Sequence, residues 1–192
     1  MDDLVDSLAY AVNGGADMIQ IREKSLEGEK LEHLVQSVVG RVSSTTHILI
    51  NGHARIAKKE GIGLHLPENS EPISQVRTII GPDALVGKSV HSVNSAIAAE
   101  KDGADFLIVG TMFPTNSHPS KIPEGPELIR RMKESGEVDI PILGIGGITP
   151  TNAQLVLSAG ASGVAVIDSV LGSADPCESA KRLKDVLYDN VT

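Results

Sequence analysis

The sequence lacks tryptophan and has only two tyrosines, two phenylalanines and one cysteine among its 192 residues. A single cysteine, Cys177, cannot form an internal disulfide, which fits a reducing compartment. With so few rings, we do not expect an aromatic cage for a ligand. Long apolar runs are also missing, since none approaches the roughly 18 residues that a membrane-spanning helix needs.

The N-terminal residues 1–4 lack the basic and apolar regions of a signal peptide, so we expect a cytoplasmic protein. Positive charge is scarce, with 17 Lys and Arg against 25 Asp and Glu and a formal net charge of −8. Without a basic block, neither a nucleic acid nor an anionic membrane surface is an expected partner. Any bound anion must therefore be held by local groups. The length fits one domain over residues 1–192.

Short apolar runs recur along the chain and alternate with stretches of helical spacing. The runs are continuous rather than alternating, which is typical of strands covered on both faces of a parallel sheet. They lie at residues 17–22, 47–51, 63–66, 84–90, 105–110, 140–145 and 163–167. The clearest helical spacing is that of Leu31, Leu34, Val35 and Val38, and Thr149-Pro150 predicts the start of another helix.

The joint between helix and strand repeats a short Gly-Ala motif, at residues 15–17, 103–105 and 160–162. Such a repeat indicates a recurring βα unit, and therefore an α/β fold. Seven strands and a leading helix leave two architectures open. One is a (β/α)₈ TIM barrel that lacks its first strand, and the other is an open doubly wound sheet.

Polar side chains at the strand ends are the first candidate site residues. Gln20, Arg22 and Lys24 are two apart, so an extended strand would present them on one face as an anion clamp. Asn51 and Ser89 each follow a buried run. The structural alternatives are a solvated rim for the clamp, a turn at Asn51 and a helix cap at Ser89. His65, within a strand, is more often a satisfied core or rim residue than a catalyst.

The longest polar stretch follows the strand at 105–110 and contains Thr115, Ser117, His118 and Lys121. A loop of this length is either a functional lid or a plain surface loop.

Glycines at the end of the next strand, including Gly146 and Gly147, predict a phosphate cradle because the backbone can approach a ligand there. Ile167 and Ser169 would complete it at the end of the last strand, since barrels often hold phosphate after strands seven and eight. The alternative is tight packing at the rim. Asp168 opposes phosphate binding unless it points away or is paired with a cation.

Taken in order, eight motifs resemble the thiamine phosphate synthase/TenI superfamily. They are QIREK at 20–24, ING at 50–52, GLHL at 63–66, GKSVH at 87–91, GADF at 103–106, FPT at 113–115, GIGGI at 144–148 and GVAV at 163–166. The resemblance covers almost the whole chain from residue 11. It implies a (β/α)₈ barrel whose first strand precedes the helix with which this sequence begins.

The resemblance implies one of two activities. In the synthase, residues matching Gln20, Arg22, Lys24 and Asn51 hold a pyrimidine pyrophosphate, and Mg²⁺ is required. The same resemblance carries over Ser89, Thr115, Gly146 and Gly147. The synthase also has two Mg²⁺-binding Asp residues, for which this chain has Gly52 and Ser70. Glu68 is the nearest substitute.

TenI-type proteins tautomerise a thiazole carboxylate phosphate without a metal. They often carry a His where this chain has Thr111, so His118 or Lys121 would have to act as the acid/base. The missing Asp residues favour this branch. We therefore expect a metal-independent thiazole tautomerase-like enzyme with no cofactor.

Two alternatives remain from the sequence. One is a thiamine phosphate synthase that couples hydroxymethylpyrimidine pyrophosphate to thiazole phosphate with Mg²⁺. The other is a non-catalytic binder of thiazole or thiamine phosphate. In each case the small-molecule partner is a thiazole phosphate, joined in the synthase by the pyrimidine pyrophosphate. The sequence leaves open whether the chain forms a homo-oligomer.

Overall fold

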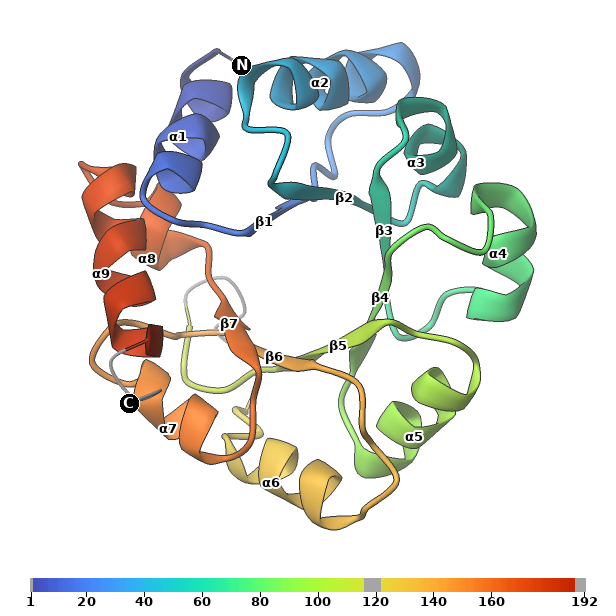
Figure 1. Ribbon diagram of the computed structural model, residues 1–192, viewed down its shortest axis with the longest axis vertical. Coiled ribbons are helices and arrows are strands. Elements are labelled where there is room, and N and C mark those ends of the chain that lie inside the picture. The colour runs from blue at the N-terminus through green and yellow to red at the C-terminus, as the bar shows by residue number, and fades with distance from the viewer. Residues whose placement is uncertain (1, 116–121, 189–192) are drawn as a thin grey trace.

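Seven parallel strands pair in chain order in the computed structural model, which describes residues 2–115 and 122–188. They are β1 (Met18–Ile21), β2 (His47–Asn51), β3 (Gly63–Leu66), β4 (Val86–Val90), β5 (Phe106–Gly110), β6 (Ile142–Ile145) and β7 (Gly163–Ala165). Figure 1 shows the sheet curling into an incomplete barrel with the helices outside it. The predicted parallel α/β sheet is confirmed.

Helices cover the outer face of the sheet, and those from α2 to α7 connect successive strands (Figure 1). They are α1 (Asp2–Asn13), α2 (Gly28–Arg41), α3 (Ala54–Glu60), α4 (Ile73–Ile80), α5 (Val93–Lys101), α6 (Glu127–Glu134), α7 (Ala153–Ser158), α8 (Asp168–Leu171) and α9 (Pro176–Tyr188). In α2, the predicted apolar stripe is buried at Leu31, Leu34, Val35 and Val38. The strands therefore have apolar cover outside, as their continuous apolar sequence requires.

The inner face of the sheet carries a small apolar cluster of its own. Leu49, Phe106 and Ile108 are its buried members. Phe106 lies against Gly87, where an added Cβ would come within 2.2 Å of the ring, so the glycine makes room for the aromatic side chain. Full burial of such side chains contributes roughly 1.5–3 kcal/mol each. This cluster fills the barrel interior and forms the floor beneath the polar residues at the carboxyl ends of the strands.

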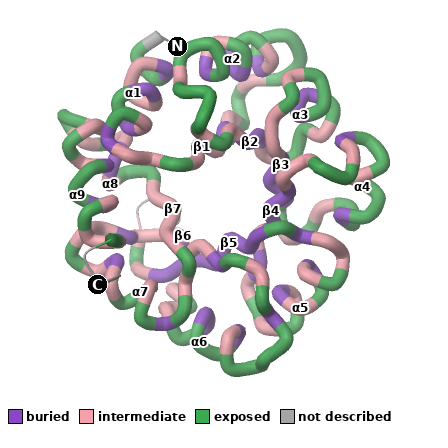
Figure 2. Tube along the Cα trace, in the orientation of Figure 1, coloured by how far each residue is buried: buried purple, intermediate pink, exposed green. Residues whose placement is uncertain are grey.

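The two edge strands of the sheet are β1 and β7, and no strand lies between them in the described part of the chain. Helices α1, α8 and α9 gather on this side (Figure 1), with Ala11, Val170 and Ala180 buried between them. Figure 2 shows β3, β4 and β5 largely buried and β7 only partly so. The strands follow chain order and curl, whereas a doubly wound sheet reverses its order, so the doubly wound alternative is wrong.

Element bounds differ from the prediction mainly at strand ends. Five of the strands are shorter than their apolar runs: four begin one or two residues later, and two, β1 and β7, end earlier. The helix predicted to start at Thr149-Pro150 begins at Ala153 instead. The side-chain oxygen of Asn152 accepts a hydrogen bond from the Thr149 amide, which forms a turn before the helix. Gly103 and Gly160, the first residues of two of the Gly-Ala joints, have positive φ after their helices. Among the described residues, no helix is long and apolar enough to cross a membrane.

Candidate active site

The end of β1 provides the first three candidate residues. Gln20 is half-buried within the strand, whereas Arg22 and Lys24 follow in the loop to α2 and are exposed. The strand ends at Ile21. The prediction that one strand face presents all three residues is therefore met only by Gln20, because Arg22 and Lys24 lie beyond the strand. Neither cation forms an ion pair within the described part of the chain. Both are therefore available to an anion.

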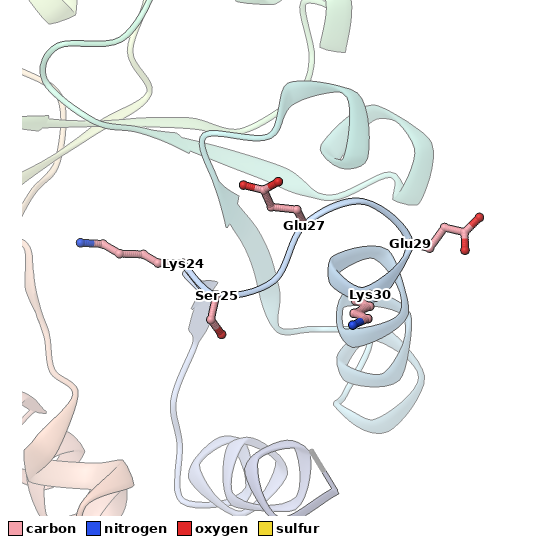
Figure 3. A pocket seen from close by; sticks show the side chains of 5 residues that line it. All are labelled: Lys24, Ser25, Glu27, Glu29 and Lys30. Atoms are coloured by element: carbon pink, nitrogen blue, oxygen red, sulfur yellow. The ribbon is translucent and has the colours of Figure 1, made fainter.

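Lys24 also lines an open hollow of about 470 Å³ beside α2. Its other lining residues are Ser25, Glu27, Glu29 and Lys30. Figure 3 shows the Lys24 side chain extending away from those of Glu29 and Lys30. With two carboxylates against two ammonium groups in its lining, this hollow has no excess of positive charge to hold an anion. None of the polar residues of β2 to β4 lines this hollow. The candidate site is therefore better defined by the side chains that converge at the strand ends.

Asn51, His65 and Ser89 meet inside the sheet near the carboxyl ends of β2, β3 and β4. The His65 Nδ1 atom lies 2.9 Å from Asn51 Oδ1, and its Nε2 atom lies 3.1 Å from Ser89 Oγ. Strand pairing places Asn51 opposite His65, which is itself opposite Gly87, two residues before Ser89. His65 is only 4% exposed. The three side chains form one hydrogen-bonded row across three neighbouring strands.

The His65 ring is neutral near pH 7. Its burial, together with the nearby positive charges of Arg22 and Lys88, lowers the pKa of His65 to about 4. A neutral imidazole has one N–H donor and one acceptor nitrogen. With the Asn51 carbonyl accepting from Nδ1, the Ser89 hydroxyl donates to Nε2. The Asn51 amide hydrogens and a lone pair on the Ser89 oxygen then remain available to a ligand.

Thr111 and the glycine turn after β6 pack against each other. Thr111 is 4% exposed, and its Cγ2 atom would lie 2.6 Å from a Cβ added to Gly146. The carbonyl oxygens of Phe113 and Pro114 fill the same space at Gly147. Both glycines have positive φ, +104° and +63°. Their lack of a side chain therefore serves packing against residues 111–114, which is the structural alternative that the sequence left open.

Backbone amides of the same rim remain candidates for holding a phosphate. No hydrogen bond in the described part of the chain uses the N–H of Gly147, Asp168 or Ser169 as donor. The Ser169 hydroxyl donates to the Ile148 carbonyl, so it does not offer that hydrogen to a ligand. Ile167 is exposed. The Asp168 carboxylate has no cationic partner among the described residues. The expected repulsion between this carboxylate and a bound phosphate is therefore not offset.

The loop after β5 carries the other candidates. Thr115 is half-buried. Ser117, His118 and Lys121 lie outside the described residues, so their assignment as binding or acid/base groups stays a prediction.

The two positions expected to hold Mg²⁺ after β2 and β3 carry no carboxylate, although Glu71 follows the second of them and lines a hollow with Gly52. Such an ion is usually held through one or two carboxylates, and the two positions in question are Gly52 and Ser70. Both Glu68 oxygens accept hydrogen bonds from His91, one from its amide at 3.1 Å and one from its ring at 2.7 Å. Although burial opposes ionisation, these bonds and one with Ser95 hold the pKa of Glu68 below its usual value. Both Glu68 oxygens are thus already used in hydrogen bonds just before the start of α5.

A lysine stands beside the second of these positions. The Lys88 ammonium donates to the Ser70 hydroxyl at 2.9 Å, and Lys88 is 9% exposed. Two unit charges 4 Å apart interact by about 4 kcal/mol at an effective dielectric constant of 20, and a divalent ion doubles this. This ammonium alone would repel a divalent ion bound at Ser70, but the carboxylates of Asp102, Glu68 and Glu71 interact with it and offset part of that repulsion. No cluster of three metal-ligating side chains is found among the described residues.

Sequence reasoning underrated two residues of this region. His65 was expected to be a satisfied core residue, and it is, but its partners are both candidate ligand-binding groups. Lys88 was not singled out at all. A charged residue within the otherwise apolar and small strand Val86–Val90 was the available signal.

Comparison with known proteins gives a consistent result. A model of the thiamine monophosphate synthase family (TMP-TENI) matches residues 1–170. The thiamine-phosphate synthase of Chlorobium limicola is 41% identical over 184 residues, which cover 94% of this chain and 87% of that protein. The thiamine-phosphate synthase of Moorella thermoacetica is 40% identical over 181 residues, with coverage of 92% and 85%.

Among solved structures, a thiamine phosphate pyrophosphorylase from Pyrococcus furiosus superimposes with a TM-score of 0.87 at 30% identity. The match covers 98% of this chain and 91% of that one. A 3-hexulose-6-phosphate synthase has a TM-score of 0.72 at 16% identity, which shows a shared fold only.

Proposed function

The chain belongs to the thiamine monophosphate synthase/TenI family, and from this premise we propose that it is a thiamine-phosphate synthase. The proposal rests on one observation: relatives that are about 40% identical over nearly the whole chain are named thiamine-phosphate synthases. The sequence alone favoured the thiazole tautomerase branch. The relatives instead favour the condensation that was the alternative.

In the proposed reaction, the bond between the pyrimidine methyl carbon and the pyrophosphate oxygen breaks. The pyrophosphate leaves with the bonding electron pair, and the thiazole nitrogen then forms the new C–N bond with the resulting cation. Charge therefore accumulates on the leaving pyrophosphate, and groups that stabilise it accelerate the step. Arg22 and Lys24, exposed and unpaired in the described part of the chain, would meet this charge beside Gln20.

The row on β2 to β4 would orient the reacting molecules. Asn51 offers amide hydrogens and Ser89 offers a lone pair, both fixed in direction by His65. The amides of Gly147 and Ser169 would receive the thiazole phosphate across the barrel mouth. Thr111, buried against Gly146, would support this turn. His118 and Lys121 are not required as acid or base in this reaction.

The tautomerase remains a second candidate because of one observation. The strand ends that would carry metal-binding carboxylates have Gly52 and Ser70, so a reaction that needs no metal suits them.

Product analysis decides between these activities. The chain is incubated with hydroxymethylpyrimidine pyrophosphate and thiazole phosphate, once with Mg²⁺ and once with EDTA. Thiamine phosphate is then oxidised to its fluorescent derivative and separated by chromatography. We expect thiamine phosphate and an equal amount of pyrophosphate. If neither forms while a thiazole carboxylate phosphate is tautomerised, the condensation is refuted. Binding without turnover in either assay would instead support a non-catalytic binder.

A further inference from the structure

Between the two cations that follow β1 stands a carboxylate that pairs with neither of them. Glu23 lies between Arg22 and Lys24 in the sequence, yet it forms no ion pair with either in the described part of the chain. Opposite charges so close along the chain attract each other. A specific contact must therefore hold this carboxylate away from its neighbours.

Ser25 provides that contact. Its backbone amide and its hydroxyl both donate to the same oxygen of Glu23, Oε1, each at 2.8 Å. These two hydrogen bonds are the main reason why the pKa of Glu23 lies below its usual value. Hydrogen bonds to an ionised acceptor are roughly twice as strong as those between neutral groups. The carboxylate therefore stays charged, and its position decides which groups it affects.

The Lys24 side chain points away from this contact. Figure 3 shows the Lys24 ammonium extending in a different direction from the Ser25 hydroxyl. Because Glu23 Oε1 lies 2.8 Å from that hydroxyl, the carboxylate lies on the Ser25 side of the loop. The negative charge and the Lys24 ammonium are thus separated, although their residues are adjacent.

Apolar packing holds both ends of this loop independently of the Glu23–Ser25 contact. Strand β1 ends at the buried Ile21, and Leu26 packs against the main apolar core. The four residues between them are therefore confined by packing on either side. The hydrogen bonds of Ser25 are exposed and contribute little to holding the segment in place. Their main effect is on the direction of the Glu23 carboxylate.

We propose that Ser25 is a positioning residue of the anion clamp: it holds the Glu23 carboxylate aside, so that Arg22 and Lys24 stay free to bind the pyrophosphate of the substrate. A carboxylate released from Ser25 would compete with the bound anion for the same two cations. The anion would then bind more weakly. The inference rests on the proposed function only for the identity of the anion as a pyrophosphate.

Calorimetric titration of the full chain with inorganic pyrophosphate, in Mg²⁺ buffer at low ionic strength, tests the inference where exposed charges are least screened. Ser25→Ala should raise the Kd by about threefold, a size typical of exposed charge interactions. Glu23→Gln removes the competing charge, so its Kd should equal or lie below that of the wild type. The double variant should bind within about twofold of Glu23→Gln, because no charge is left to release.

The double variant separates a charge effect from an effect on loop order. If Ser25 only ordered the loop, Ser25→Ala would raise the Kd by the same factor whether residue 23 is Glu or Gln, and that result would overturn the inference. A Ser25→Ala variant that binds as tightly as the wild type would also overturn it. So would a wild type that does not bind pyrophosphate, since no anion would then be held by the two cations.

Two controls accompany these variants. Ser25→Thr keeps the amide and a hydroxyl, so it should bind pyrophosphate as the wild type does. Ser37→Ala removes a hydroxyl that donates to the His33 carbonyl within α2, and it should leave the Kd unchanged. A Ser37→Ala variant as weak as Ser25→Ala would contradict a specific role for Ser25.

These readouts separate this inference from the proposed function. Pyrophosphate binding with the expected dependence on Glu23, but without thiamine phosphate formation, refutes the synthase and keeps the role of Ser25. Thiamine phosphate formation, together with an effect of Ser25→Ala that is the same with Glu or Gln at position 23, does the reverse.

Discussion

The buried His65 should make the protein less stable as the pH falls, by an amount that one substitution can isolate. The pKa of this side chain falls from the usual 6.5 to about 4 in the folded protein, chiefly because the ring is desolvated. Below pH 6.5 the unfolded chain takes up a proton on this residue and the folded chain does not. Stability due to the neutral ring is therefore complete above pH 6.5 and is lost progressively down to about pH 4.

The size of the effect follows from the two pKa values. At about 1.4 kcal/mol per pH unit, the stability lost through this group is about 2 kcal/mol at pH 5 and about 3 kcal/mol at pH 4. His65→Gln keeps hydrogen-bonding capacity but cannot take up the proton. Its free energy of unfolding should therefore depend less on pH than that of the wild type, by these amounts.

Urea unfolding followed by circular dichroism between pH 7 and pH 4 measures the difference, since the chain has no tryptophan for fluorescence. The difference in the free energy of unfolding between wild type and His65→Gln, taken at each pH, cancels the contribution of the other titrating groups. His33→Gln removes an exposed histidine of α2 and serves as the control for loss of any imidazole. Wild type and His65→Gln curves that run parallel within about 0.5 kcal/mol would refute the reasoning.

Three further substitutions, one of them a control, test contacts that hold the fold together. Gly87→Ala should destabilise the fold by about 1–3 kcal/mol in the same assay, because the added Cβ meets the Phe106 ring at 2.2 Å. Gly40→Ala, in α2 with no atom within 4 Å, should instead stabilise it by about 0.5–1 kcal/mol; equal effects at the two glycines would contradict the packing described. Arg77→Met should cost about 2–3 kcal/mol, because this guanidinium donates to three backbone carbonyls and to Asp105; a change under 0.5 kcal/mol would contradict that role.

Much of the fold could be predicted because its signals are local. Continuous apolar runs mark strands covered on both faces, and glycines such as Gly103 mark the helix ends before them. The start of α7 was misplaced because the side chain of Asn152 competes for the Thr149 amide, a contact that spacing does not reveal. Strand ends depend on the neighbouring strand, so the run at 84–90 begins pairing only at Val86.

The site was predictable in its position but less so in its contacts. Residues at strand ends converge on one rim because all strands are parallel, which placed Asn51 and Ser89 correctly at the same end of the sheet. The role of Gly146 and Gly147 in packing depends on where residues 111–114 run, and sequence does not show this. The hydrogen bond from Lys88, within β4, to Ser70, in the loop after β3, likewise joins residues that are 18 apart in the chain.

The central claim is that the row of Asn51, His65 and Ser89 orients the substrates of the condensation. The kcat/KM of Asn51→Ala for thiamine phosphate formation tests it most directly, because the variant removes the amide hydrogens that the proposed row would direct toward the ligand. We expect kcat/KM to fall by about 100-fold or more, while the unfolding midpoint in urea changes little. An Asn51→Ala variant that forms thiamine phosphate within about threefold of the wild-type rate would contradict the account.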